Sequence, residues 1–239
     1  MPKLLVLSAA LLCQSLFAQD AAALWSSGQE HEQRGEHAQA IADYSQLLKL
    51  RPDWTAGYMH RGSEHFKMAH IRESVADFDK AVQLDPAQAP YNWQRGISLY
   101  YAGRYEDGRK QFDSHQTVNG NDVENAVWRY LCMARTVGVN AARAGILPIE
   151  RDTRVPMMQI YALYKGMATV DDVLAAAKAG NPGPEVLNQR LFYAHLYIGL
   201  YYEAASNEKD ARANIKLAVD HMVEHYMGDV ARVHLELRR

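Results

Sequence analysis

A period of 34 residues constrains this chain more than any other feature. Three sets of residues recur at that spacing: Gly28, Gly62 and Gly96; Tyr44, Phe78 and Phe112; Pro52 and Pro86. A fixed period of this length predicts stacked supersecondary units, each too small to bury its own apolar face. We number the places of the repeat from 1 to 34, starting at residues 21, 55 and 89.

Each period predicts a hairpin of two helices, because a proline that cannot continue a helix closes the second one. The expected helix pairs are residues 20–34 with 38–50, 54–68 with 72–84, and 91–101 with 105–116. The glycine at place 8 removes a side chain so that the second helix of the hairpin can approach. The aromatic residue at place 24 is expected to fill the space between units. Arginine at place 7 (Arg61, Arg95) and aspartate at place 23 (Asp43, Asp77) predict an ion pair that ties the two helices together.

These positions resemble the tetratricopeptide repeat: a small residue at place 8, glycine at 15 (Gly35, Gly103), aromatic residues at 17 and 24, and proline at 32. The resemblance implies an all-α solenoid of helical hairpins. Four positions depart from the family pattern: Ala69 at place 15, Ser74 and Gly108 at place 20, and His115 at place 27.

The period weakens after the third repeat and returns near the C-terminal end. Five residues fit places 8, 11, 20, 24 and 27 of a further repeat: Gly199, Tyr202, Ala211, Ile215 and Ala218. Gly96 and Gly199 differ by 103 positions, three periods plus one, so the middle has room for two degenerate repeats. We therefore expect a signal peptide at 1–18, three repeats over 19–122 (21–54, 55–88 and 89–122), degenerate helical repeats at 123–191, and a C-terminal repeat with a capping helix at 192–239.

Two stretches, residues 95–112 and 194–221, are similar to the NlpI-type periplasmic adaptor lipoproteins. That resemblance implies an adaptor that docks envelope proteases or peptidoglycan hydrolases, often as a homodimer with a lipid anchor.

The first 18 residues resemble a secretory signal peptide. Lys3 precedes a largely apolar segment from Leu4 to Phe17, and Ala18 offers a small residue at a cleavage point. This predicts export to the periplasm or the medium. Lipidation of Cys13 is the less favoured alternative, because Leu12 stands where lipoprotein signal peptidases require a small residue. After cleavage Cys132 is the one remaining cysteine, and we expect it to be buried and inert.

Composition and motifs argue against most other classes of function. The net charge is −2 with no basic run, which gives no indication of nucleic-acid binding. No catalytic constellation or cofactor fingerprint is present. One motif keeps a metallohydrolase open: His221, Glu224 and His225 form H-x-x-E-H, which on a helix could hold zinc. An oligomeric structural spacer is a third hypothesis.

The favoured hypothesis is a scaffold that binds a protein or peptide in its concave groove. In this repeat class, places 2, 5, 9, 12 and 13 of the first helix face that side. Large apolar residues on a face that packing does not require indicate a partner site. The predicted groove residues are Trp25, Gln29, Glu32, Met59, Ser63, Phe66, Lys67, Trp93, Ile97, Tyr100, Tyr101, Leu196 and Leu200.

Overall fold

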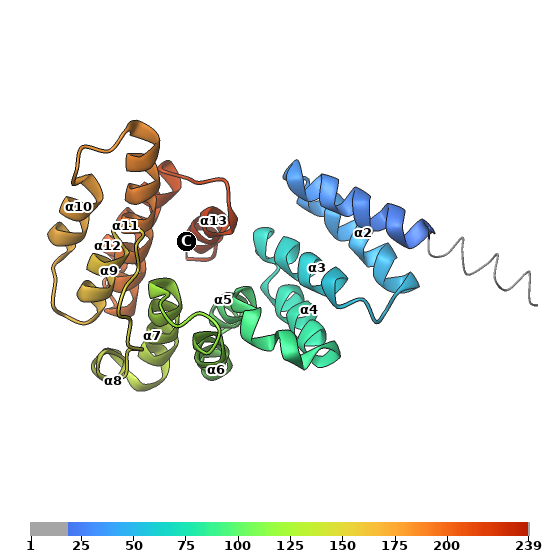
Figure 1. The fold of residues 1–239 in the computed structure, drawn as a ribbon, viewed down its shortest axis with the longest axis horizontal. Coiled ribbons are helices and arrows are strands. Elements are labelled where there is room, and N and C mark those ends of the chain that lie inside the picture. The colour runs from blue at the N-terminus through green and yellow to red at the C-terminus, as the bar shows by residue number, and fades with distance from the viewer. Residues whose placement is uncertain (1–18, 239) are drawn as a thin grey trace, which may run out of the picture. The chain divides into compact units, whose positions relative to one another are not determined.

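A computed structural model describes residues 19–238 and divides the chain into two compact units, Met1–Pro86 (unit 1) and Ala87–Arg239 (unit 2) (Figure 1). The predicted signal segment, with Cys13, lies outside the described residues. Regular structure within 19–238 is entirely helical, and no helix in that range is long and apolar enough to span a bilayer. The division falls inside the array of three predicted repeats, so the first two repeats form unit 1 and the third begins unit 2.

Unit 1 contains two antiparallel hairpins, as the period predicts. A helix over residues 19–33 pairs with α2 (His37–Leu50), and α3 (Thr55–Lys67) pairs with α4 (Ile71–Leu84). The core of the first hairpin consists of Ala21, Ala40, Tyr44 and Leu47, with Leu24, Trp25, Leu50 and Trp54 packed against it. Both helices of the hairpin contribute to this core, and Trp54, which precedes α3, packs against it.

The glycines at place 8 have the packing role that the sequence predicts. A Cβ atom at Gly28 would lie 2.6 Å from the Tyr44 ring, and one at Gly96 would lie 2.6 Å from the Phe112 ring. Real Cβ atoms do not approach other heavy atoms this closely, so any side chain here would displace the aromatic residue at place 24. Close helix packing offsets the roughly 1 kcal/mol that glycine costs in a helix interior.

Unit 2 contains the remaining helices. They are α5 (Trp93–Tyr101), α6 (Tyr105–Gln116), α7 (Val123–Val137), α8 (Val139–Ala144), α9 (Met157–Tyr164), α10 (Val170–Lys178), α11 (Pro184–Ala204), α12 (Glu208–Asp220) and α13 (Tyr226–Leu237), after a short 3-10 helix at Pro86–Tyr91. The returning repeat is the α11–α12 hairpin, and its first helix is longer than expected because Pro184 begins it. Pro at the first helical position costs nothing, since that N–H has no partner within the helix. The predicted terminal helix is α13.

A left-handed residue stands at the turn of four hairpins. Place 15 is Gly35 (φ 70°), Ala69 (φ 58°) and Gly103 (φ 74°), and Ser206 (φ 60°) is its equivalent between α11 and α12. The next such residue after Gly103 is Gly138 (φ 87°), which follows α7 after 35 positions rather than 34. Gly138 and Ser206 are then two periods apart. The spacing of Gly96 and Gly199 exceeds three periods by one residue, and that residue therefore lies between Gly103 and Gly138.

The interhelical ion pair is confirmed for Arg61 and Asp77 of unit 1, whereas Asp43 lies 3.6 Å from His31 instead of an arginine, and the pair is altered in unit 2. Arg61 binds Asp77 through two bonds, Nε to Oδ2 at 2.7 Å and Nη2 to Oδ1 at 2.6 Å. Arg95 instead donates to Gln111, which occupies place 23, at 2.8 Å. The arginine at place 7 needs a hydrogen-bond acceptor at place 23, and an amide oxygen can take the role of a carboxylate there.

Unit 2 is closed by contacts between its first and last helices. On α11, Glu203 accepts hydrogen bonds from Tyr100 of α5 (3.2 Å), Arg135 of α7 (2.5 Å) and Arg238, which follows α13 (3.0 Å). The Tyr101 hydroxyl lies 2.9 Å from Nδ1 of His234 on α13. The inner face of α5 is therefore covered by the chain's own C-terminal helix.

Candidate functional site

A cavity of about 360 Å³ lies within unit 2, and we call it the inner pocket. It is lined by Trp93, Ile97, Phe112, His115, Asn119, Asp122, Glu124, Asn125, Trp128, Arg154, Tyr193, His225, Tyr226 and Met227. These residues come from α5, α6, α7, α11 and α13 and from the loops before α7, α9 and α13. Its volume is in the range of small-ligand pockets, which begins at about 300 Å³.

Aromatic side chains form one part of the lining. Trp93 and Tyr226 meet edge to face with their ring centres 5.2 Å apart, and both are partly exposed. Tyr193 stacks on His225 at 5.9 Å. Because these rings are rigid and only half-buried, they offer preformed contact area at low entropic cost.

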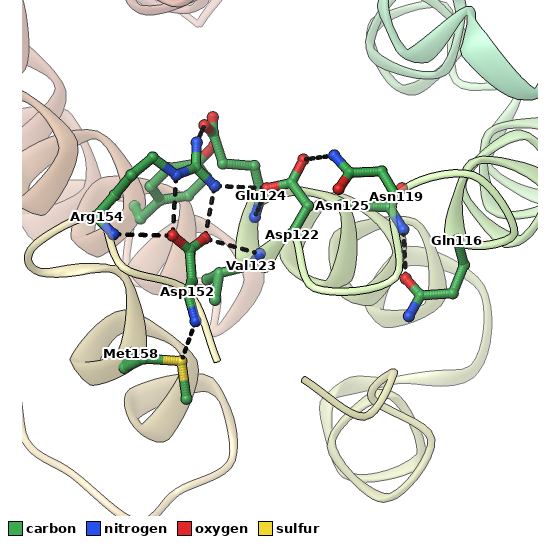
Figure 2. Close-up of polar contacts among 10 residues, drawn as sticks. Gln116, Asn119, Asp122, Val123, Glu124, Asn125, Asp152, Arg154 and Met158 are labelled. Carbon is green, nitrogen blue, oxygen red and sulfur yellow. Dashed lines mark hydrogen bonds and ion pairs between the residues drawn. The ribbon is translucent and has the colours of Figure 1, made fainter. Parts of the chain in front are cut away.

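A network of carboxylates around Arg154 forms the polar edge of the pocket (Figure 2). Nη2 of Arg154 lies 2.6 Å from both Asp122 and Asp152, and Nη1 lies 2.5 Å from Glu124. The second oxygen of Glu124 accepts a bond from the Tyr197 hydroxyl at 2.5 Å. Burial raises the pKa of Glu124, and the nearby Arg154 opposes that shift. The network also begins α7, because Asp122 accepts the Glu124 N–H at 3.0 Å and so caps the helix.

Two buried polar atoms of the lining have no hydrogen-bond partner among the described residues. They are Oδ1 of Asn125 and Nε1 of Trp128, whose residues are 3% and 2% exposed. The orientation of the Asn125 amide is fixed, since its Nδ2 donates to the Phe112 carbonyl (3.2 Å) and to Gln116 (2.9 Å). Leaving such groups unpaired costs about 1–3 kcal/mol each, so they call for an explanation.

A second cavity, of about 560 Å³, surrounds Glu203 and includes Arg135, Arg212, His234 and Arg238. It is larger, and several of its charged groups pair with one another: Arg135 and Arg238 bind Glu203, and Arg212 donates to the carbonyl of Arg238 at 3.0 Å. Burial lowers the pKa of His234 to about 4, so this imidazole is neutral at pH 7. We favour the inner pocket as the functional site because its lining includes the half-buried rings of Trp93, Tyr193 and Tyr226.

In unit 1, the predicted groove residues divide between partly exposed and buried positions. Trp25, Gln29, Glu32, Met59 and Lys67 are partly exposed, whereas Ser63 and Phe66 are buried. Trp25 stacks on Trp54 with ring centres 5.4 Å apart, and His60 bonds Glu32 at 2.9 Å. Lys67 forms a 2.5 Å ion pair with the buried Glu64. Structural contacts thus occupy part of the Glu32 and Lys67 side chains.

In unit 2, the structure brings Trp93 and Ile97 to the inner pocket. Tyr100, Leu196 and Leu200 are fully buried in the core, and Tyr101 lies against His234. Cys132 is also buried, and desolvation raises the pKa of its thiol well above the usual range. The expectation that Cys132 is buried is therefore confirmed.

The H-x-x-E-H motif does not form the helical pair that a metal site requires. α12 ends at Asp220, so His221 and His225 lie on the connection to α13. Nδ1 of His221 bonds Asn188 at 2.9 Å, and His225 accepts the Met227 N–H at 3.3 Å. No group of three or more metal-binding side chains assembles anywhere in residues 19–238. The structure gives the metallohydrolase hypothesis no support.

The sequence named only Trp93 and Ile97 of this lining as partner-binding residues, because the period does not show that the loops before α7, α9 and α13 meet α5 at one cavity. One sequence signal could have located part of it: Arg61, Arg95 and Arg129 are spaced by 34. Nη1 of Arg129 donates to the carbonyl of Gly145 at 2.6 Å, which mirrors the pairing of places 7 and 23. That phase identifies α7 as the first helix of a fourth repeat. Its place 3 is Asn125 and its place 6 is Trp128.

Comparison with known proteins agrees with this architecture. Residues 21–53 and 56–88 match the family model described as "Tetratricopeptide repeat", so these two segments are tetratricopeptide repeats. Among solved structures, the MamA protein is similar with a TM-score of 0.51 and 13% identity, over 85% of this chain and 92% of that one. A tetratricopeptide repeat protein from Parabacteroides merdae is similar with a TM-score of 0.54 and 13% identity, over 91% and 84% of the two chains. The fold is thus an all-α solenoid of tetratricopeptide-repeat type.

Proposed function

We propose that this protein is a scaffold that binds a segment of another protein, and that the inner pocket of unit 2 is a contact site. The observation that carries the proposal is a preformed cavity whose lining includes the half-buried aromatic rings of Trp93, Tyr193 and Tyr226. Rigid aromatic residues beside a desolvated pocket are typical of binding hot spots. Residues 21–53 and 56–88, as tetratricopeptide repeats, add support, since solenoids of stacked repeats present extended binding surfaces.

Site-specific photocrosslinking in the native cells tests this proposal. The photoreactive residue benzoylphenylalanine replaces Trp93 in the full-length protein and, as a control, Met167, which is 74% exposed but remote from the pocket lining. We expect a discrete, light-dependent covalent adduct from position 93 and none from position 167. The absence of an adduct at 93, or the same adducts from both positions, would refute a partner site at the pocket.

We further propose that the scaffold is exported to the cell envelope and recruits envelope proteases or peptidoglycan hydrolases. The support is the sequence pattern of residues 1–18 and the resemblance of residues 95–112 and 194–221 to NlpI-type adaptors. N-terminal sequencing and intact mass of the protein from an envelope fraction test export: a chain that begins at Gln19 fits cleavage after Ala18. A retained Met1, or a lipid on Cys13, would contradict that cleavage.

A further inference from the structure

The turn between α3 and α4 in unit 1 brings two histidine rings together. His65 lies in the last turn of α3, and His70 is the residue before α4. The backbone N–H of His70 donates to the His65 carbonyl at 2.9 Å, and Ala69 between them is left-handed (φ 58°). Nδ1 of one ring lies 3.4 Å from Nδ1 of the other. The turn therefore holds the two imidazoles against each other.

The corresponding turn of the first repeat holds an ordinary hydrogen bond. Places 11 and 16 are His31 and Glu36 there, and the same backbone bond joins them at 2.8 Å. Nδ1 of His31 lies 2.5 Å from the Glu36 carboxylate. In the second repeat a histidine, His70, stands where the first repeat has that carboxylate. The exchange replaces a donor and an acceptor by two ring nitrogens of the same kind.

A hydrogen bond explains the histidine pair poorly. N–H hydrogen bonds in proteins usually place the heavy atoms about 2.7–3.2 Å apart, and the two Nδ1 atoms are farther apart than that. The His70 side chain also does not cap α4, a role that side chains at this position often have. Within residues 19–238, no side chain other than the partner histidine forms a hydrogen bond with either ring. Both imidazoles therefore keep their capacity to bind something else.

The separation of the two nitrogens fits a tetrahedral metal ion better. Zn²⁺ binds imidazole nitrogens at about 2.0–2.1 Å, and a tetrahedral angle then places two ligand nitrogens about 3.3–3.4 Å apart. Ions that prefer right-angled geometry, such as Cu²⁺ and Ni²⁺, need nitrogens about 2.9 Å apart for bonds of the same length. The ring centres are 5.6 Å apart, farther than the Nδ1 atoms, so each nitrogen lies on the side of its ring that faces the other. His70 is exposed and His65 is half-buried, so an ion can reach the pair from solvent.

We propose that His65 and His70 bind a zinc ion through their Nδ1 atoms, with water or a group of another molecule in the other two positions. Two protein ligands make the site weaker and more exchangeable than a structural site with four. Because the ion joins the end of α3 to the start of α4, it stabilises the hairpin of the second repeat. The site belongs to unit 1, and it depends neither on the inner pocket nor on the proposed scaffold function.

Titration of the full-length protein with Zn²⁺, in competition with a chromophoric zinc indicator, tests the site. We expect one equivalent of zinc to bind the native sequence. Loss of a residue that only supports a metal ligand costs about 10–100-fold in affinity, so loss of a ligand itself should cost at least as much. His65→Gln and His70→Gln should therefore each weaken zinc binding by at least about tenfold.

A second pair of histidines provides the matched control. The rings of His195 and His221 are 5.9 Å apart in unit 2, a spacing close to that of the proposed site. Their Nδ1 atoms are already occupied, since each bonds the side chain of an asparagine, Asn214 or Asn188, at 2.9 Å. We therefore expect His195→Gln to leave zinc binding unchanged.

Histidine side-chain ¹H–¹⁵N NMR spectra of the native sequence identify the coordinating atoms without relying on a variant that has to fold. We expect zinc to shift the Nδ1 signals of His65 and His70 together, at the same zinc concentration as the titration. Three outcomes would overturn the inference: no saturable zinc binding, binding that both variants retain, or zinc-dependent shifts confined to other histidines. Any of these would leave the pair as a turn contact between two imidazoles.

Discussion

Units 1 and 2 use the same hairpin but different residues to tie it together. In unit 1, Arg61 is held by two bonds to the Asp77 carboxylate. In unit 2, the equivalent Arg95 bonds the Gln111 amide, and Arg129 bonds the backbone carbonyl of Gly145. The geometry of the hairpin survives the loss of the ion pair because a guanidinium needs only a well-placed acceptor.

The two units also differ in what covers their inner helices. In unit 2, α13 brings Tyr226 against Trp93 and His234 against Tyr101, so the last helix of the chain shapes the pocket. Unit 1 has polar pairs at the corresponding places, such as Lys67 with Glu64. Divergence of sequence after the second repeat therefore accompanies a cavity beside α5 rather than a loss of packing.

The largest expected effect on stability comes from a substitution near the start of α13. A Cβ atom at Gly228 would lie 2.1 Å from the backbone oxygen of Val223, which cannot move without displacing the start of the helix. We expect Gly228→Ala to destabilise the protein by at least about 3 kcal/mol. At Gly62 of unit 1 the nearest atoms would be 3.2 Å away or farther, so Gly62→Ala should cost no more than about 1 kcal/mol. Urea unfolding of both variants measures the difference, and equal losses would contradict it.

The second prediction concerns the stability of the protein at low pH, which depends on the buried His234. Its pKa is lowered to about 4 in the fold, whereas an unfolded histidine titrates near 6.5. The unfolded chain therefore binds more protons between these values, and stability falls as the pH drops from about 6.5 to about 4, by roughly 3 kcal/mol in total. The variant His234→Gln should flatten this dependence. Denaturant midpoints at pH 7, 5.5 and 4.5 would show it, and an unchanged slope in the variant would assign the acid sensitivity to other groups.

A smaller effect concerns Arg154. Its replacement by methionine leaves Asp122, Glu124 and Asp152 together without a cation, and we expect a loss of about 2 kcal/mol at pH 7, given the partial exposure of the arginine. Protonation of the carboxylates would relieve the repulsion, so the loss should shrink at pH 4.5. In unit 1, Arg61→Met leaves only Asp77 unpaired and should show a weaker dependence on pH. Identical pH profiles for the two variants would refute the excess of charge at the pocket edge.

The smallest expected effect is a gain. Ala69 adopts φ 58° at a turn where Gly35 and Gly103 hold the equivalent place. A left-handed backbone costs a residue with a Cβ roughly 1 kcal/mol relative to glycine, so Ala69→Gly should raise stability by up to about that amount. Gly103→Ala should lower it by a similar amount in unit 2. Thermal melts of the two variants check the opposite signs, and a lower melting temperature for Ala69→Gly would contradict the account.

The period of 34 determined the fold class and the helical hairpins. It correctly predicted the close helix approach at the place-8 glycines and the pairing of Arg61 with Asp77, because both depend on contacts between helices that adjoin in sequence. The inner pocket could not be derived in that way. Trp93 meets Tyr226, and Glu124 meets both Arg154 and Tyr197, across separations that follow no period.

The groove prediction likewise separates what the period can show from what it cannot. Places 5, 9, 12 and 13 predicted residues on the inner side of each first helix, but periodicity carries no information about what covers them. In unit 2, α13 and Glu203 bury Tyr100 and engage Tyr101, whereas Trp93 remains at a cavity. The sequence by itself thus determined a solenoid of helical hairpins, since local spacing sets which helices pair. Only the tertiary structure decided which inner residues reach a cavity, because that depends on where a helix more than 100 residues away returns to pack.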